Sequence, residues 1–129
     1  MDAATLSAAA VALLVTGFGT GFAQEAGKSA WEAIRRVGQV VAARLGRHDD
    51  QRRALADLEA SPDDTGKRAV VAGYVRRDVE ADAEFAALLE RLVADVQSHE
   101  AGRTLIASAT GNAKQANFGG DNFGSITFS

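Results

Sequence analysis

The residues with the most distinctive spacing are the asparagines, phenylalanines and glycines of Asn117–Gly124, which read NFGGDNFG. The triplet Asn-Phe-Gly occurs twice, five residues apart, and Phe128 continues the five-residue spacing of phenylalanines. The chemistry open to these residues is non-covalent. Stacked asparagines form hydrogen-bonded ladders, and phenylalanine and isoleucine pack in dry interfaces between sheets. We therefore predict a segment that stacks in register with copies of itself as cross-β.

Charge and glycine placement support this prediction. Lys114 and Asp121 are the only charged residues after Arg103, and the segment contains no proline. The sequence Gly119–Asn122 allows a sharp turn that folds two short strands face to face. The residues expected to template this assembly, here called the templating motif, are Asn117, Phe118, Gly119, Gly120, Asp121, Asn122, Phe123, Gly124 and Ile126. Two alternatives stay open: a pentapeptide-repeat solenoid, for which the repeats are few, and a terminus without order in the monomer.

A second glycine cluster follows the apolar run VALLVTG. Gly17 and Gly19 match the start of a dinucleotide-binding fingerprint, but Phe22 occupies the third glycine position and no second βαβ pattern follows. His48 and His99 stand alone beside acidic residues, as surface histidines do, and the chain has no cysteine. We expect neither an enzyme nor a cofactor or metal site.

The distribution of charge argues against a nucleic-acid partner. Net charge is −3, and the stretch from Arg47 to Ala101 carries eight basic and thirteen acidic residues. Arginine and lysine do occur as adjacent pairs, namely Arg35–Arg36, Arg52–Arg53, Lys67–Arg68 and Arg76–Arg77. Such pairs are usual on solvated helix faces, although a basic face also attracts anionic lipid headgroups.

The amino-terminal run from Ala3 to Gln24 has no charged residue. It is long enough to cross a bilayer, but alanine dominates it and Gly17, Gly19 and Gly21 interrupt it. Asp2 and the lack of a preceding basic region argue against a secretory signal. We expect a helix that is buried in a bundle or that switches between bundle and membrane. The residues expected to insert are Leu6, Val11, Leu13, Leu14 and Phe18.

Helix signals occupy most of the remaining chain up to Glu100. A first helix, capped by Thr5 or Ser7, is expected to end near Thr16, with an extension to Phe22 possible. Apolar spacing, turn residues and acidic caps then predict further helices over 26–45, 49–59, about 63–81 and 83–100. Gly46 is expected to end the second, Asp49 or Asp50 to cap the third and Asp82 to cap the fifth. The prediction is an all-α fold, a small antiparallel bundle of four to five helices. We place a domain boundary near Ala101–Arg103, giving a bundle over 1–101 and a flexible tail over 102–129 that forms cross-β on assembly.

These features resemble bacterial Bell-domain proteins, the counterparts of fungal HeLo and HeLo-like domains. The resemblance rests on the apolar amino terminus, the AGKSAWEAI stretch (Ala26–Ile34) and the helical bundle. It rests also on the carboxy-terminal GNAKQANFGGDNFGSITF, whose Gly-Gly-Asp-Asn-x-Gly-x-Ile core is similar to bacterial amyloid signalling motifs. The chain lacks the Val-Gln-Val-Gly tetrad of the animal motif, and its Gly17–Gly21 cluster departs from a continuous inserting helix.

The resemblance implies a cell-death effector in bacterial immunity. A NOD-like receptor with a matching motif would template the tail into amyloid, and the clustered bundles would permeabilise the membrane through their first helix. The implied partners are other copies of this chain, that receptor and membrane lipids. The implied location is cytoplasmic at rest and the inner face of the plasma membrane on activation. The alternatives are a non-lytic adaptor or scaffold that assembles through the same tail, and a constitutively anchored membrane protein.

Overall fold

The computed structural model describes residues 1–18 and 27–118, with side chains up to residue 110. The helices within these ranges are α1 (Ala3–Thr16), α3 (Lys28–Leu45), α4 (Asp49–Ala60), α5 (Thr65–Ala81), α6 (Ala83–Gln97) and α7 (Glu100–Phe118). The described part of the chain contains no strand. The all-α prediction is therefore confirmed, and α7 is a helix that the sequence analysis did not expect.

Acidic caps set the beginnings of three helices. The carboxylate of Asp2 accepts a hydrogen bond from the backbone N–H of Thr5 at 2.7 Å, so the prediction of a Thr5 or Ser7 cap is wrong. Asp64 and Asp82 cap α5 and α6 in the same way. A carboxylate suits these places because it accepts from unpaired N–H groups and faces the positive end of the helix dipole.

The other predicted boundaries agree closely with the helices. Gly46 follows α3 as predicted, and its N–H bonds back to the carbonyl of Ala42. The cap of α4 is His48 rather than Asp49 or Asp50, which lie instead in the first turn. The first helix ends at Thr16, and the possible extension to Phe22 lies outside the described residues.

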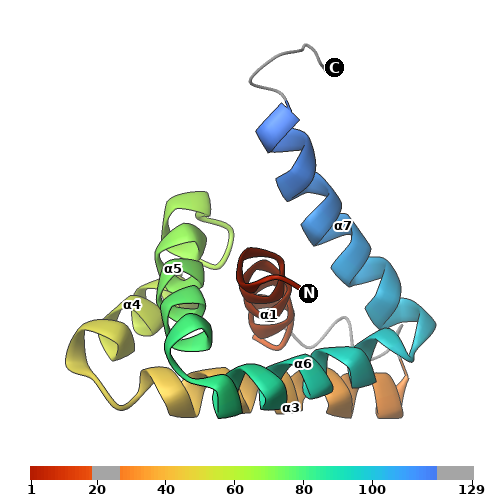
Figure 1. Ribbon diagram of the computed structural model, residues 1–129, viewed down its shortest axis with the longest axis horizontal. Helices are drawn as coiled ribbons and strands as arrows, with labels where there is room; N and C mark the ends of the chain where they lie inside the picture. Colours follow the sequence, from red (N-terminus) through yellow and green to blue (C-terminus); the bar gives the residue numbers. More distant parts are fainter. Residues whose placement is uncertain (19–26, 119–129) are drawn as a thin grey trace.

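The helices surround α1. In Figure 1, α1 is seen almost end-on at the centre, with α5 on one side and α7 on the other, while α3 and α6 run together beneath it. Helix α4 lies outside α5 and packs on it and on α3. All four of α3, α5, α6 and α7 contact α1, so the first helix is the centre of the core.

The apolar spacing that predicted α3, α5 and α6 marks their buried faces. The buried residues are Ala30, Ala33, Ile34, Val37, Val41 and Leu45 of α3, Val71, Val75 and Val79 of α5, and Phe85, Leu89, Val93 and Val96 of α6. Trp31 and Tyr74 are only half-buried, because each lies at the edge of its apolar face. Leu58 anchors α4 and Leu55 packs partly against the same core.

Helix α7 crosses the position at which the sequence analysis placed a domain boundary. It begins at Glu100 and its helical backbone continues through Phe118. Glycine, serine, threonine and asparagine make this stretch a weak helix former, which is why the pattern suggested a tail. Packing supplies what propensity lacks, since Ile106 is buried and Leu105 packs against the core. The division into domains at 101/102 stays a prediction.

Candidate functional site

The residues predicted to insert into a membrane lie in the core. Leu6, Val11, Leu13 and Leu14 are buried, and Phe18 is half-buried against the same cluster. Together with Ala9 and Ala10 they place apolar atoms on several sides of α1. A helix that is hydrophobic around most of its circumference is characteristic of a protein interior or a membrane. The bundle thus keeps most of the apolar surface of α1 away from water.

Two hydroxyl groups of α1 are satisfied within the helix. Ser7 Oγ donates to the carbonyl of Ala4 at 3.0 Å, and Thr16 Oγ1 donates to the carbonyl of Ala12 at 2.8 Å. Because both partners of each bond belong to α1, these bonds persist when the surroundings of α1 change, and the hydroxyls need no partner on another helix. Contacts between the body of α1 and its neighbours are accordingly dominated by packing of apolar side chains.

Helix α1 is short as observed. Its 14 residues span about 21 Å, against a hydrocarbon thickness of about 30 Å. Over the described residues, no helix combines the length and the apolar character that crossing a membrane requires.

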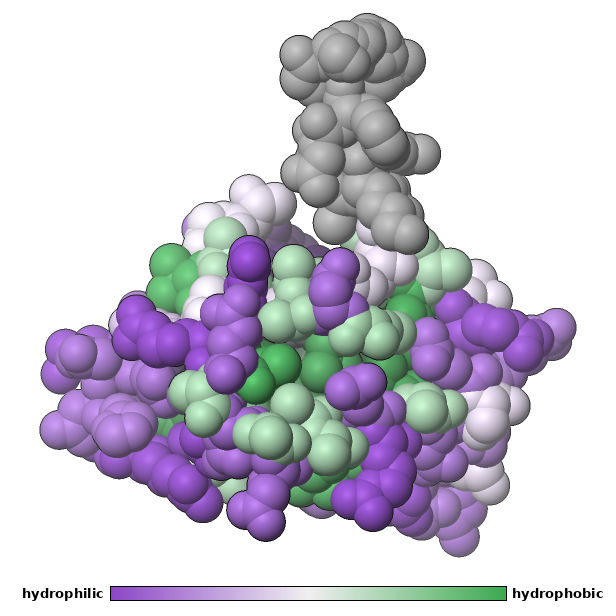
Figure 2. Space-filling model, in the orientation of Figure 1, coloured by the Kyte–Doolittle hydropathy of each residue, from purple (hydrophilic) through white to green (hydrophobic). Residues whose placement is uncertain are grey.

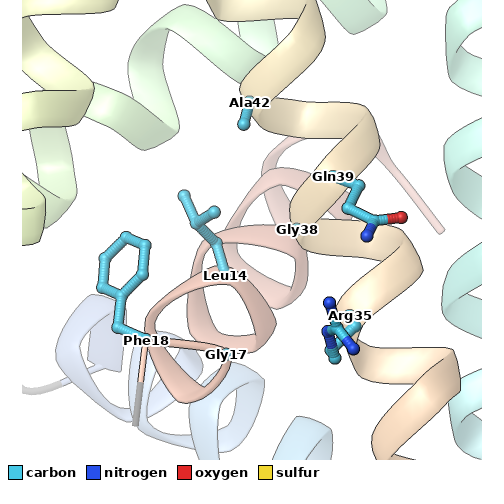
Figure 3. A pocket seen from close by; sticks show the side chains of 7 residues that line it. All are labelled: Leu14, Gly17, Phe18, Arg35, Gly38, Gln39 and Ala42. Atoms are coloured by element: carbon cyan, nitrogen blue, oxygen red, sulfur yellow. The ribbon is translucent and has the colours of Figure 1, made fainter.

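A shallow groove lies where α1 ends against α3. Figure 3 shows Leu14 and Phe18 projecting from the end of α1, with Arg35 and Gln39 on the facing helix. Gly38 lies close to α1, and a Cβ there would meet Leu14 Cδ1 at 3.7 Å, an ordinary contact. The groove measures about 200 Å³, below the usual range for ligand pockets. Gly17, which lines it, follows a helix rather than the strand that a dinucleotide fingerprint requires.

The surface around the visible end of α1 is partly apolar. Figure 2 shows hydrophobic residues gathered in the middle of this face, where α1 lies in Figure 1, with hydrophilic residues around them. Ala4 of α1 is exposed, and Ala8 and Ala12 follow it at four-residue spacing and are half-buried. The enclosure of α1 is therefore incomplete along this line of small residues.

The corner between α6 and α7 is unusually tight. Gly102 is buried in the first turn of α7, and a Cβ built on it would lie 2.4 Å from the carbonyl oxygen of Val96. Only glycine fits such an approach of two backbones.

Helix α7 ends at Asn117 and Phe118, the first residues of the templating motif, while Gly119 to Ile126 lie outside the described residues. A continuous helix thus leads from the wall of α1 to the motif.

Several charged residues that the sequence analysis singled out have structural partners. Arg36 contacts Asp95, Arg52 contacts Asp49 and Arg76 contacts Glu80, all in exposed pairs. Pairs of this kind favour the solvated-face interpretation of these three arginines and contribute little stability.

His48 is exposed at the start of α4, and His99 is half-buried between α6 and α7. The two histidines therefore belong to separate corners of the bundle.

Two carboxyl groups have lowered pKa values. Hydrogen bonds from Thr5 hold the pKa of Asp2 below its ordinary value of 3.8. The hydrogen bond from Arg44, helped by the backbone N–H of Phe85, does the same for the pKa of Asp82. Sequence reasoning found the capping role of Asp82 but missed its bond to Arg44, 38 residues away, because no local pattern signals a pair between distant helices.

Comparison with known protein families identifies the bundle. The model of the Het-E N-terminal domain matches residues 1–128. The chain belongs to the Het-E N-terminal domain family. These domains are related to HeLo domains and are associated with cell-death and heterokaryon-incompatibility signalling. No curated protein and no solved structure matches the chain.

Family membership confirms the HeLo-related part of the predicted resemblance. It gives no support to the assignment of the carboxy-terminal residues as a bacterial amyloid motif, which stays a prediction. The match covers α7 and the whole of the templating motif as well as the bundle. In this Het-E N-terminal domain, the candidate functional site is thus α1 together with the helices that enclose it.

Proposed function

We propose that this Het-E N-terminal domain is a cell-death effector that acts on a membrane through α1 after its templating motif assembles. One observation carries the proposal. The central helix is apolar on several sides, and one of the helices that enclose it, α7, continues directly to the motif. Any change in the backbone at the end of α7 therefore acts on a wall of the site that stores α1.

Assembly would work through the backbone and through concentration. A NOD-like receptor that carries a matching motif would offer a strand edge, to which the motif adds by main-chain hydrogen bonds. Many tethered copies raise the local concentration of bundles. Conversion of Asn117 and Phe118 from helix to strand would shorten α7 and would act along that helix on Leu105 and Ile106, which pack in the core. The protein would then move to the inner face of the plasma membrane.

The length of α1 shapes how it would act on lipid. At about 21 Å it is shorter than the hydrocarbon layer, so we propose that several copies insert into one leaflet and thin or permeabilise it. Leu6, Val11, Leu13, Leu14 and Phe18 supply the inserted surface. Their burial at rest explains why the monomer would be harmless.

Dye release from anionic vesicles tests this proposal. Replacing Leu13 or Leu14 by aspartate is unsuitable, because both are buried and the bundle would unfold. Ala8→Asp places a charge at the half-buried edge of α1, whereas Ala86→Asp places one at a half-buried position of α6. With seeded full-length chain, we expect Ala8→Asp to reduce release about ten-fold or more and Ala86→Asp to leave it near the native level.

Two further measurements make the test decisive. A chain that ends at Phe118 should give neither fibrils with the 4.7–4.8 Å cross-β reflection nor dye release. Circular dichroism of each variant checks that the bundle is folded. Equal release by Ala8→Asp and the native chain, both folded, would show that α1 does not enter the membrane. Release by the truncated chain at the native rate would exclude control through the motif.

A second candidate function is a non-lytic scaffold. The observation that favours it is that no helix in the described ranges is long and apolar enough to cross a membrane. On this alternative, assembled bundles recruit another protein through exposed side chains of the outer helices. Seeded fibrils of full-length chain that leave anionic vesicles intact would favour the scaffold over the membrane-active effector.

A further inference from the structure

One arginine joins three helices beside the core. Arg44, in the last turn of α3, donates from Nη1 to Asp82 Oδ2 at 2.8 Å. Its Nε lies 3.6 Å from Asp78 Oδ2 in the last turn of α5. Its guanidinium carbon stands 4.9 Å from the ring centroid of Phe85 in the first turn of α6. A single side chain thus holds the end of α3 to the corner between α5 and α6.

This cluster lies where the α4–α5 hairpin, residues 49–81, joins the rest of the bundle. The chain leaves α3 just after Arg44 and returns to α6 through Asp82, and Figure 1 shows both connections at the same corner. Arg44 therefore ties the two ends of the hairpin together. Rotation of the hairpin about these connections would draw Asp78 away from Arg44.

The hairpin forms one wall of the site that holds α1. Helix α5 packs along α1 on the side away from α7, while α4 packs on α5. Helix α5 meets α3 over only a short stretch, so Arg44 provides much of their direct connection. Movement of the hairpin as a unit would uncover α1. It would break the contacts of α5 with α6 and of α4 with α3, but it would leave the packing of α3, α6 and α7 on α1 in place.

The two carboxylates depend on Arg44 to different degrees. Asp82 is one-third exposed, and its Oδ1 accepts from the backbone N–H groups of Glu84 and Phe85. Asp78 is 14% exposed, its Oδ2 is enclosed, and this atom accepts no hydrogen bond from the described residues. Loss of Arg44 would therefore leave the carboxylate of Asp78 on α5 without a compensating charge, whereas the carboxylate of Asp82 would keep its backbone hydrogen bonds.

We propose that the Arg44–Asp78 pair is a latch that holds the α4–α5 hairpin closed over α1. Its consequence for membrane activity rests on the proposed function, whereas the opening itself is a property of the bundle alone. The pair adds to the apolar packing of Val71, Val75 and Val79 of α5, and the hydration of its two charges offsets part of the cost of opening. The latch and α7 thus control opposite sides of α1.

The absence of cysteine from the chain allows a direct test. Val75→Cys places one thiol on the buried face of α5, and Val93→Cys places one on α6, outside the hairpin; both valines are buried. Each is combined with Arg44→Met in the full-length chain, and labelling by a thiol reagent is timed under native conditions. We expect labelling at position 75 to accelerate about ten-fold or more, with little change at position 93.

A second variant separates the latch from the other contacts of Arg44. Asp78→Asn removes the ion pair but leaves Arg44 bonded to Asp82, so it should also accelerate labelling at position 75 and not at position 93. Where Arg44→Met does not fold, Asp78→Asn decides in its place. Equal acceleration at both positions, or no acceleration by Asp78→Asn, would overturn the latch. Opening without vesicle leakage after seeding would leave the latch standing and count against the proposed function.

Discussion

Adding one methyl group at Gly102, in the corner between α6 and α7, should destabilise the bundle. In Gly102→Ala, the new Cβ would lie 2.4 Å from the carbonyl oxygen and 2.5 Å from Cγ1 of Val96, and the carbonyl belongs to the backbone. The carbonyl oxygen cannot yield without moving a helix. Gly73→Ala is the matched control, because Gly73 is an exposed residue inside α5 whose Cβ would meet nothing within 4 Å.

The two substitutions should change stability in opposite directions. Overpacking costs about 1–3 kcal/mol, and a clash with backbone belongs at the upper end. Replacing glycine by alanine within a helix returns about 1 kcal/mol. We therefore expect Gly102→Ala to lower the free energy of unfolding by about 2 kcal/mol and Gly73→Ala to raise it by about 1 kcal/mol. For a chain of this size these are shifts in Tm of roughly −6 to −10 °C and +3 to +5 °C.

Urea and thermal unfolding, followed by circular dichroism at about 222 nm, measure both variants. The loss in Gly102→Ala should be accompanied by faster amide exchange in α7, because the helix must tilt away from α6 and expose Ile106. A Gly102→Ala protein as stable as Gly73→Ala would show that the two backbones do not approach as described. A loss of stability with amide exchange unchanged throughout α7 would show that the strain is relieved elsewhere.

Two other predictions concern the acidic caps. Asp64→Ala removes the carboxylate that accepts a hydrogen bond from the backbone N–H of Lys67 at 3.1 Å, and it should lower the free energy of unfolding by about 1 kcal/mol. The control is Asp63→Ala, one residue earlier and outside the cap. It should change the free energy of unfolding little in the same urea titration. Because the pKa values of Asp2 and Asp82 are lowered from 3.8, their contribution to stability is complete above that value and is lost as the pH falls below it. The free energy of unfolding, measured from pH 6 to about pH 2, should fall accordingly, and it should fall less in Asp82→Asn. An unchanged dependence of the free energy of unfolding on pH in that variant would contradict the role given to Asp82.

Local patterns in the sequence are enough to predict the helices that have strong apolar periodicity and clear ends. The faces of α3, α5 and α6 follow from apolar residues three and four apart, and Gly46 and Asp82 act where the pattern placed them. These features are local, since a side chain and the backbone within four residues of it decide them. The same reasoning found that α1 has no charged residue and identified the residues that its burial conceals.

Which helices meet cannot be predicted from local patterns and is seen in the fold. Helix α7 has weak local signals and is held by packing on α1 and α6, so its sequence looked like the start of a tail. The bond between Arg44 and Asp82 spans 38 positions, and the need for glycine at position 102 comes from an approach between two backbones. Periodicity shows that a helix has an apolar face, but it does not show which neighbouring helix covers that face. That choice depends on how the helices share one core, and it places α1 at the centre with α7 and the α4–α5 hairpin on its two sides.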